Sequence, residues 1–218
     1  MNYAELRQSI IDFTESTDTT FEDNIDTFIQ NTEDRIYNSV LIPVLRKNVT
    51  GNMTADNKYL SCPSDFLSPY ELAVQVVTTV DEVATTNYEY LLQKDVSFVR
   101  QNYPNPAYTD TPQYYAQFDA NTFILAPTPD ESYVTELHYY YYPQSIVTAG
   151  TSWVGDNFPM CLLYGSLCEA NIFLKGEADL QQSYEKQFLD NMGLLKSYAD
   201  GRTRNDNYRQ PAPRGRFQ

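Results

Sequence analysis

Residues 112–174 constrain the fold most, because the spacing of apolar residues changes there from a strand pattern to a helix pattern. Runs at 114–118, 122–125 and 133–142 are rich in aromatic and β-branched residues, which predicts three strands. Proline and aspartate at 127–130 predict a rigid turn between two of them, since proline fixes φ and aspartate bonds its own backbone. The leucines that follow have helical spacing. The segment therefore predicts an α+β fold.

Two helices are predicted at the start of the chain. Residues 2–15 repeat apolar side chains at helical spacing, and a second apolar stripe extends over residues 21–40. Thr19 or Thr20 is expected to cap the second helix, because an acidic residue follows three positions later. Pro43 then ends this helix pair, since proline cannot continue a helix.

A second helix pair is predicted near the end of the chain. Residues 158–174 carry a wide apolar face, in which Gly165 and Ala170 would let another helix approach closely. A further apolar stripe over residues 180–198 continues as the last helix. Gly201 is expected to be its C-cap, because glycine adopts the left-handed conformation that ends many helices.

The residues between the two helix pairs are predicted to be rich in strands. Gly51 and Asn52 indicate a turn between two short strands, and the β-branched run at 72–80 predicts a strand. Leucine and valine spacing predicts a short helix over residues 90–101. Residues 149–152 are expected to be a short linker.

The order of these elements predicts an α+β domain organisation in which the two helix pairs pack together as a four-helix bundle. The strand-rich middle is then an insertion whose ends are adjacent. The expected boundaries are 1–43 and 151–201 for the bundle, 44–150 for the inserted β-rich domain and 202–218 for an extended C-terminal arm.

The charge of the chain is strongly divided between body and arm. The formal net charge is -14, and residues 202–218 hold five arginines against one aspartate, a net of +4. Subtracting +4 from -14 leaves -18 for residues 1–201. Such an acidic body repels DNA phosphates, which argues against a sequence-reading nucleic-acid binder. The basic arm instead suits an acidic protein surface on another copy or on a partner.

Cysteine usage and hydropathy restrict the compartment. Cys62, Cys161 and Cys168 are odd in number, and the last two lie too far apart along one helix to bridge. Cys161 and Cys168 are expected to be core residues, and the low, odd cysteine count suits a reducing compartment such as a cytoplasm. The N-terminus lacks a signal-peptide pattern, and no apolar run reaches the length of a membrane span.

The sequence contains no pattern that is typical of a catalytic or metal site, so no enzyme, cofactor or metal is expected. His138 is the only histidine, which leaves one candidate for any triad or zinc site. No glycine pattern that cradles phosphates is present, which excludes an ATP-driven motor as far as motifs can. Five acids crowd one stretch without the glycine of a calcium loop, and a solvated face is expected there: Glu15, Asp18, Glu22, Asp23 and Asp26.

Tyrosine is unusually abundant, with 19 residues, and four of them are consecutive at Tyr139, Tyr140, Tyr141 and Tyr142. One interpretation is a strand with aromatic side chains on both faces, one face buried and the other covered by a helix or a neighbouring subunit. These four tyrosines are therefore interface candidates. The alternative interpretation is a platform on which sugars stack.

Four segments stand out by their order along the chain: Cys-Pro-Ser-Asp-Phe-Leu at 62–67, the short helix that ends near Tyr103, the run from Leu125 to Pro143, and Leu-Leu-Tyr-Gly-Ser-Leu-Cys-Glu-Ala at 162–170. Together they resemble the head-to-tail adaptor proteins of tailed bacteriophages, the family that includes tail tubular protein A of short-tailed phages. The resemblance rests on their order and spacing over roughly residues 3–200. In that family a helical bundle carries a β-rich domain.

This resemblance implies a structural protein of the virion without enzymatic activity. It implies a dodecameric ring in the neck between the portal and the tail or nozzle, through which double-stranded DNA passes without sequence-specific binding. No membrane partner is implied. The alternative is a carbohydrate-binding or carbohydrate-cleaving phage tail protein, for which the tyrosines and many carboxylates would be the motive.

The basic C-terminal arm is predicted to dock on the portal. Arginine offers a planar fork for carboxylates of a neighbouring protein, and two prolines favour an extended segment that can lie along a groove. Phe217 is expected to anchor the end in an apolar pocket. The docking residues predicted are Arg202, Arg204, Tyr208, Arg209, Arg214, Arg216 and Phe217. The alternative is an unused terminus.

Overall fold

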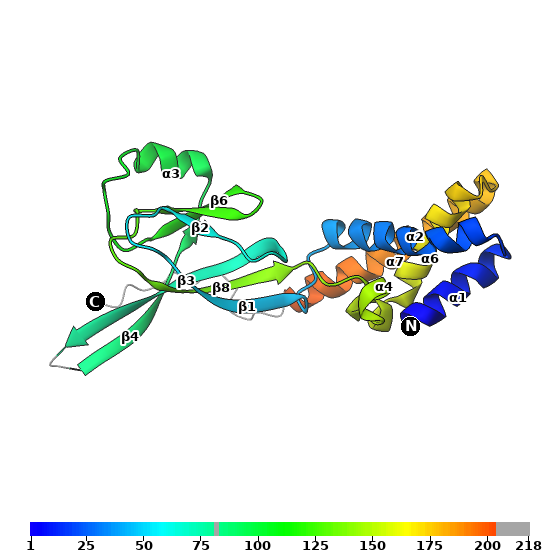
Figure 1. The fold of residues 1–218 in the computed structure, drawn as a ribbon, viewed down its shortest axis with the longest axis horizontal. Coiled ribbons are helices and arrows are strands. Elements are labelled where there is room, and N and C mark those ends of the chain that lie inside the picture. The colour runs from blue at the N-terminus through cyan, green and yellow to red at the C-terminus, as the bar shows by residue number, and fades with distance from the viewer. Residues whose placement is uncertain (81–82, 204–218) are drawn as a thin grey trace. The chain divides into compact units, whose positions relative to one another are not determined.

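The computed structural model describes residues 1–80 and 83–203 (Figure 1). Over these residues the chain forms seven helices and two four-stranded sheets, which confirms the predicted α+β class. It packs as two compact units. The helical unit combines Met1–Pro43 with the described residues from Pro143 onward, and the β unit is Val44–Tyr142.

The helical unit is built around one central helix. Its elements are α1 (Tyr3–Thr14), α2 (Thr19–Ser39), α4 (Ile146–Ala149), α5 (Trp153–Asn157), α6 (Pro159–Phe173) and α7 (Ala178–Thr203). Helix α6 contacts α1, α2, α5 and α7 (Figure 1), and it is apolar on nearly every side, as a helix surrounded by others must be. The predicted four-helix bundle is not confirmed, because α1 and α2 pack on α6 far more than on each other.

The close helix approach expected at Gly165 is confirmed. A Cβ atom at this position would lie 2.3 Å from Cγ2 of Thr32 on α2 and 3.0 Å from the Phe188 ring on α7. Arg35 of α2 fastens the same three helices, since its guanidinium lies 2.9 Å from Glu185 and 3.6 Å from Glu169. The contact of α2, α6 and α7 is therefore tight at its centre and ion-paired at its margin.

Side chains cap the first two helices, and the cap of α2 is not the residue that the sequence predicted. Helix α1 begins with a capping box, in which Asn2 Oδ1 accepts the Glu5 N–H and Glu5 accepts the Asn2 N–H. Helix α2 is capped by Asp18, whose carboxylate accepts the Thr20 N–H at 2.9 Å, and the predicted cap at Thr19 or Thr20 is wrong. A carboxylate satisfies the free N–H and also suits the positive end of the helix dipole.

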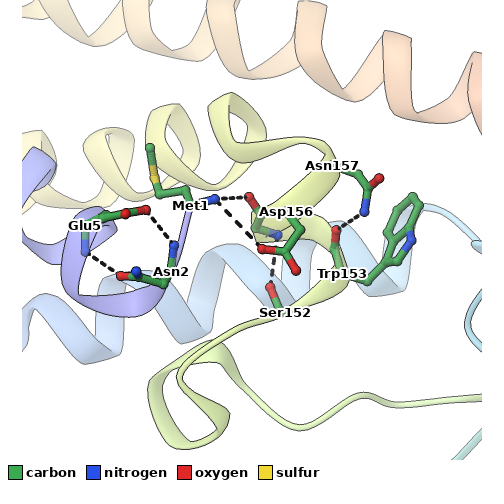
Figure 2. Close-up of polar contacts among 8 residues, drawn as sticks. Met1, Asn2, Glu5, Ser152, Trp153, Asp156 and Asn157 are labelled. Atoms are coloured by element: carbon green, nitrogen blue, oxygen red, sulfur yellow. Dashed lines mark hydrogen bonds and ion pairs between the residues drawn. The ribbon is translucent and has the colours of Figure 1, made fainter.

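The first residues are held against helix α5 (Figure 2). The Met1 ammonium donates to the Gly155 carbonyl oxygen at 2.9 Å and lies 3.9 Å from the Asp156 carboxylate. Ser152 caps the helix by accepting the Gly155 N–H at 3.0 Å. A Cβ atom at Gly155 would lie 2.7 Å from the Met1 carbonyl oxygen, so only glycine leaves room for this contact.

Two other helix boundaries correct the sequence prediction. Residues before the expected linker form the short helix α4, which ends at Gly150 with φ at 78°. Helix α7 continues through Gly201 to Thr203, so the expected C-cap at Gly201 is wrong. Among the described glycines only Gly150 has a positive φ, which means that Gly201 does not adopt the capping conformation.

The β unit consists of two sheets and one helix in three layers (Figure 1). The first sheet has the order β1-β8-β3-β4 and the second the order β2-β7-β6-β5. The strands are β1 (Arg46–Asn52), β2 (Tyr59–Ser61), β3 (Phe66–Val80), β4 (Val83–Tyr90), β5 (Leu92–Gln93), β6 (Tyr114–Asp119), β7 (Thr122–Ala126) and β8 (Val134–Tyr141). Leu72, Leu137, Tyr115 and Phe123 belong to the core between the sheets. Helix α3 (Val96–Asn102) covers the other face of the second sheet through Val99.

The pairing of β1 with β8 overturns the predicted turn at Gly51 and Asn52. Both residues lie within β1, where Gly51 is opposite Thr135 and Asn52 is opposite Val134. A Cβ atom at Gly51 would lie 3.3 Å from Oγ1 of Thr135, so glycine permits close pairing here. The available partner strand decides the conformation of a dipeptide that would otherwise favour a turn.

The strand and helix boundaries between residues 66 and 102 also differ from the prediction. Strand β3 begins at Phe66 rather than 72, with register shifts beside Pro69 that accommodate the missing N–H. The helix predicted over 90–101 is only the seven-residue α3, because β4 extends to Tyr90 and β5 follows it. Asp95 caps α3 by accepting the Ser97 N–H at 2.7 Å.

Candidate functional site

The tyrosines of strand β8 make packing and hydrogen-bond contacts inside the subunit. Tyr139 is 3% exposed and donates its hydroxyl to Asp65 Oδ1 at 2.8 Å. Burial and this bond raise the pKa of Tyr139 to about 12, so its hydroxyl stays protonated at neutral pH. Burial opposes ionisation of Asp65 as well, but hydrogen bonds from Lys47 and Tyr139 hold its pKa below the ordinary value. The Lys47 ammonium lies 2.6 Å from the carboxylate of Asp65, the residue before β3, so this ion pair links β1 to the start of β3.

The other three tyrosines differ in exposure. Tyr140 is 7% exposed and its ring lies 6.1 Å from that of Tyr70 in an edge-to-face arrangement. Tyr141 is half-buried under the Lys47 ammonium, 4.1 Å from its ring centre, and Tyr142 is also half-buried. Of the four consecutive tyrosines, only Tyr141 and Tyr142 therefore keep exposed surface.

His138 lines a small polar cleft on the outer face of the first sheet. The other lining residues are Asn48, Glu71, Ala73, Tyr90 and Glu136, and the cleft holds about 120 Å³. Asn48 donates to the Glu136 carboxylate, and the Tyr70 ring lies 5.0 Å from the imidazole. The volume is below the roughly 300 Å³ of typical small-molecule pockets. Packing on the sheet therefore accounts for the histidine.

A larger hollow of about 510 Å³ lies beside the end of α3. Tyr103 and Tyr108 stack in it with ring centres 6.2 Å apart, and its remaining lining residues are Asn102, Pro104 and Asn105. Two tyrosines could stack on a sugar, but this lining contains no carboxylate. Glycoside hydrolysis needs a pair of acids across the scissile bond, so this hollow does not fit a cleaving site.

Three of the five crowded acids serve helix packing. Asp18 caps α2, Glu22 pairs with Arg7 of α1 at 2.9 Å, and Asp26 accepts the Tyr3 hydroxyl at 2.5 Å. The contacts of Glu22 and Asp26 fasten α1 to α2. Within residues 1–80 and 83–203, no three side chains of His, Cys, Asp or Glu are grouped closely enough to hold a metal ion.

The three cysteines are free thiols, and burial explains their chemistry. Cys161 and Cys168 are buried on α6, as expected, and Cys62 is half-buried. Burial raises the pKa of Cys161 and Cys168 to about 12 and that of Cys62 to about 11. Thiols with such pKa values are almost fully protonated at neutral pH and make poor nucleophiles.

The predicted docking arm lies mostly beyond the described residues. Arg202 lies in the last turn of α7, so the helix extends past the expected start of the arm. The remaining docking residues lie outside the described part of the chain: Arg204, Tyr208, Arg209, Arg214, Arg216 and Phe217. Their role stays a prediction.

The sequence prediction missed one outer strand of the first sheet, β4, and found the other, β1, only as a short strand before the expected turn at Gly51. Strand β4 was not expected, although residues 83–90 contain valine, two threonines and two tyrosines, which favour strands. Beyond Gln75, β3 pairs with β4 alone, so the two strands extend as a hairpin past the rest of the sheet (Figure 1). Strand β1 forms the opposite edge. These edges are open surfaces that a strand of another chain can pair with.

The chain matches a known protein family over nearly its whole length. The family described as SU10 adaptor protein matches residues 1–214. No curated protein matches the chain. No helix in the described residues has the length and hydropathy that a membrane span requires. The match covers both compact units and confirms the resemblance to phage head-to-tail adaptors.

Proposed function

Since the chain belongs to the SU10 adaptor protein family, we propose that it is a ring subunit in the neck of a phage particle, between the portal and the tail or nozzle. The family match carries this proposal. A structural adaptor role and a place in the virion follow from the family itself. The ring, its dodecameric copy number and its position in the neck are the further steps that we propose.

The charge of the body supports a DNA channel lined by these subunits. Residues 1–201 carry a net charge of -18, which is the total of -14 less the arm's +4. Acidic walls repel phosphates, so double-stranded DNA would slide past them rather than bind. We propose that the protein acts without catalysis and without a cofactor.

The partners proposed are the portal, the tail or nozzle protein and neighbouring copies. The basic arm of residues 202–218 would dock on acidic surface of the portal, where its arginines can bind carboxylates. Tyr141 and Tyr142 would contribute to the contact with a neighbour, because they retain exposed surface at the end of β8. Such heterologous contacts repeat around a closed ring.

Electron microscopy of intact virions tests the proposal. We expect density for a ring of this protein between portal and tail, into which both compact units fit. Absence of the protein from the neck, or isolated copies on the capsid, would overturn it. Glycan binding or hydrolysis by the purified protein would instead favour the carbohydrate-active alternative.

A further inference from the structure

The outer strands of the first sheet fit each other across a subunit boundary. We propose that β4 of one subunit pairs with β1 of the next copy, so that the sheet continues from subunit to subunit. This inference rests on the proposed ring, for which it supplies the contact. The occupant of each open edge is therefore a second copy of this chain.

Strand β4 has the properties of an edge that is covered in the assembled protein. All residues from 84 to 90 are exposed, and Val77 of the facing strand β3 is 61% exposed. Edge strands of monomers are commonly protected by lysine or proline, and residues 83–90 contain neither. A hairpin of two strands alone is marginally stable in water, so an added strand would stabilise its free part.

Strand direction favours a head-to-tail contact. Each pair in the order β1-β8-β3-β4 is antiparallel, so β1 and β4 run in opposite directions. If the next copy continues the sheet in the same sense, its β1 lies antiparallel to β4 without any reversal. Because β1 uses one edge and β4 the other, the contact can repeat around a ring.

Charge selects a register for this pairing. Strand β1 contains Arg46 and Lys47 and no acid, whereas β4 contains Glu89 and no base. Placing Lys47 opposite Glu89 aligns all seven residues of β1 with residues 84–90 of β4. Opposite charges directly across an antiparallel pair stabilise it. The ammonium has three donors and can therefore keep its bond to Asp65 while it binds Glu89.

The same register keeps the two faces of the sheet consistent. Lys47 lies opposite Tyr139, and Glu89 lies opposite Val74. Tyr139 and Val74 both belong to the core between the sheets, so Lys47 and Glu89 are on the same face. A shift by one residue would place them on opposite faces.

The outer face gains a cation–π contact in this register. Arg46 of the next copy would lie opposite Tyr90, whose side chain is 61% exposed in the subunit. Within its own subunit the Arg46 guanidinium already lies 4.4 Å from the centre of the Tyr70 ring. Tyr90 would add a second exposed ring on the side of the neighbour.

Cross-linking in virions tests the pairing with Val49→Cys/Asn87→Cys, two residues that face each other in this register. Within one subunit these positions are separated by three strand spacings, roughly 14 Å, and are also offset along the strands, so they are too far apart for a disulfide. Mild oxidation should therefore give a ladder of covalent trimers and larger species. The control Val49→Cys/Thr86→Cys places the thiols on opposite faces and should give none, as should the parent chain with its native cysteines.

Charge reversal gives an independent test. The protein should be absent from the neck of virions made with Lys47→Glu alone or with Glu89→Lys alone. It should be present again in virions made with the double variant. If parent virions contain the ring, but oxidation gives no ladder and the double charge variant gives no rescue, the proposed pairing is wrong. The proposed function then remains intact. A product that stops at the dimer, or a bond to a different protein, overturns the pairing as well. Absence of the ring itself removes the proposed function.

Discussion

A buried carboxylate joins the two halves of the helical unit. Glu33 on α2 is 2% exposed, and its Oε1 accepts the N–H of Ile146, the first residue of α4, at 2.9 Å. Burial raises the pKa of Glu33 above its ordinary value of 4.5, although hydrogen bonds from Ser145 and Ile146 act in the other direction. The residue holds the chain where it re-enters the helical unit.

Replacing this glutamate by glutamine should change how stability depends on pH. A raised pKa in the folded state means that folding favours the protonated form, so its contribution is fully present below the unfolded pKa. The contribution is lost as pH rises through the folded pKa. Because Glu33→Gln carries no charge, its Tm relative to the parent should increase over that window and then stay constant. Thermal unfolding at several pH values measures this.

The variant Glu33→Ala provides the control for that series. It also removes the charge, but it leaves the buried N–H of Ile146 without its acceptor. Its free energy of unfolding should therefore be lower than that of Glu33→Gln by about 1–3 kcal/mol at every pH. A Tm difference for Glu33→Gln that decreases with rising pH would contradict the assigned direction.

Two helical glycines should respond oppositely to alanine. Gly165→Ala would place Cβ against Thr32 and Phe188, so overpacking should cost about 1–3 kcal/mol. At Gly193 on α7 an added Cβ atom would have no neighbour within 4 Å, and Gly193→Ala should stabilise the helix by about 0.5–1 kcal/mol. Urea unfolding of both variants measures the difference. Equal shifts would mean that the three helices are not closely packed at Gly165.

At the scale of elements, the backbone conformation of a glycine decides whether a helix ends at that residue. Gly150 ends α4 with a positive φ, whereas Gly201 remains inside the last turn of α7. The sequence predicts an interruption at both glycines, a linker at Gly150 and a helix C-cap at Gly201. The conformation that each adopts distinguishes a helix end from a helix interior.

This distinction predicts different effects of alanine at the two positions. Gly150→Ala should lower stability by about 1–2 kcal/mol, because an L-residue is strained in the left-handed region. Gly201→Ala should leave Tm unchanged or raise it, because the helix passes through this residue. Thermal unfolding compares them. A loss at Gly201 as large as that at Gly150 would restore the C-cap predicted from the sequence.

At the scale of the whole molecule, the basic arm should matter for attachment and not for folding. Removal of residues 204–218 deletes no periodic apolar position, so the truncated chain should keep its Tm. Attachment to DNA-filled heads should fall sharply, because four of the five arm arginines and Phe217 are lost. Complementation of a phage that lacks the gene, followed by counting tailed particles, measures attachment. Normal attachment would discard the docking role.

The sequence determined the elements whose local signals agree with one another. The helical spacing of Leu6 and Ile10 predicts that they share the apolar face of α1, and both are fully buried. The strands at 114–119 and 122–126 were predicted within a residue, since β-branched and aromatic residues occupy them and a turn separates them. The order of such elements was also sufficient to indicate the adaptor family.

Tertiary structure decided the elements whose local signals conflict or are weak. Gly51 and Asn52 favour a turn, yet pairing with β8 makes them a strand, because backbone hydrogen bonds to an available partner outweigh a weak local preference. Strand β4 likewise depends on β3 beside it. The roles of Tyr139 and Tyr140 followed only from the rings and carboxylate around them. Spacing along the chain specifies which residues share a face, but only packing specifies what that face contacts.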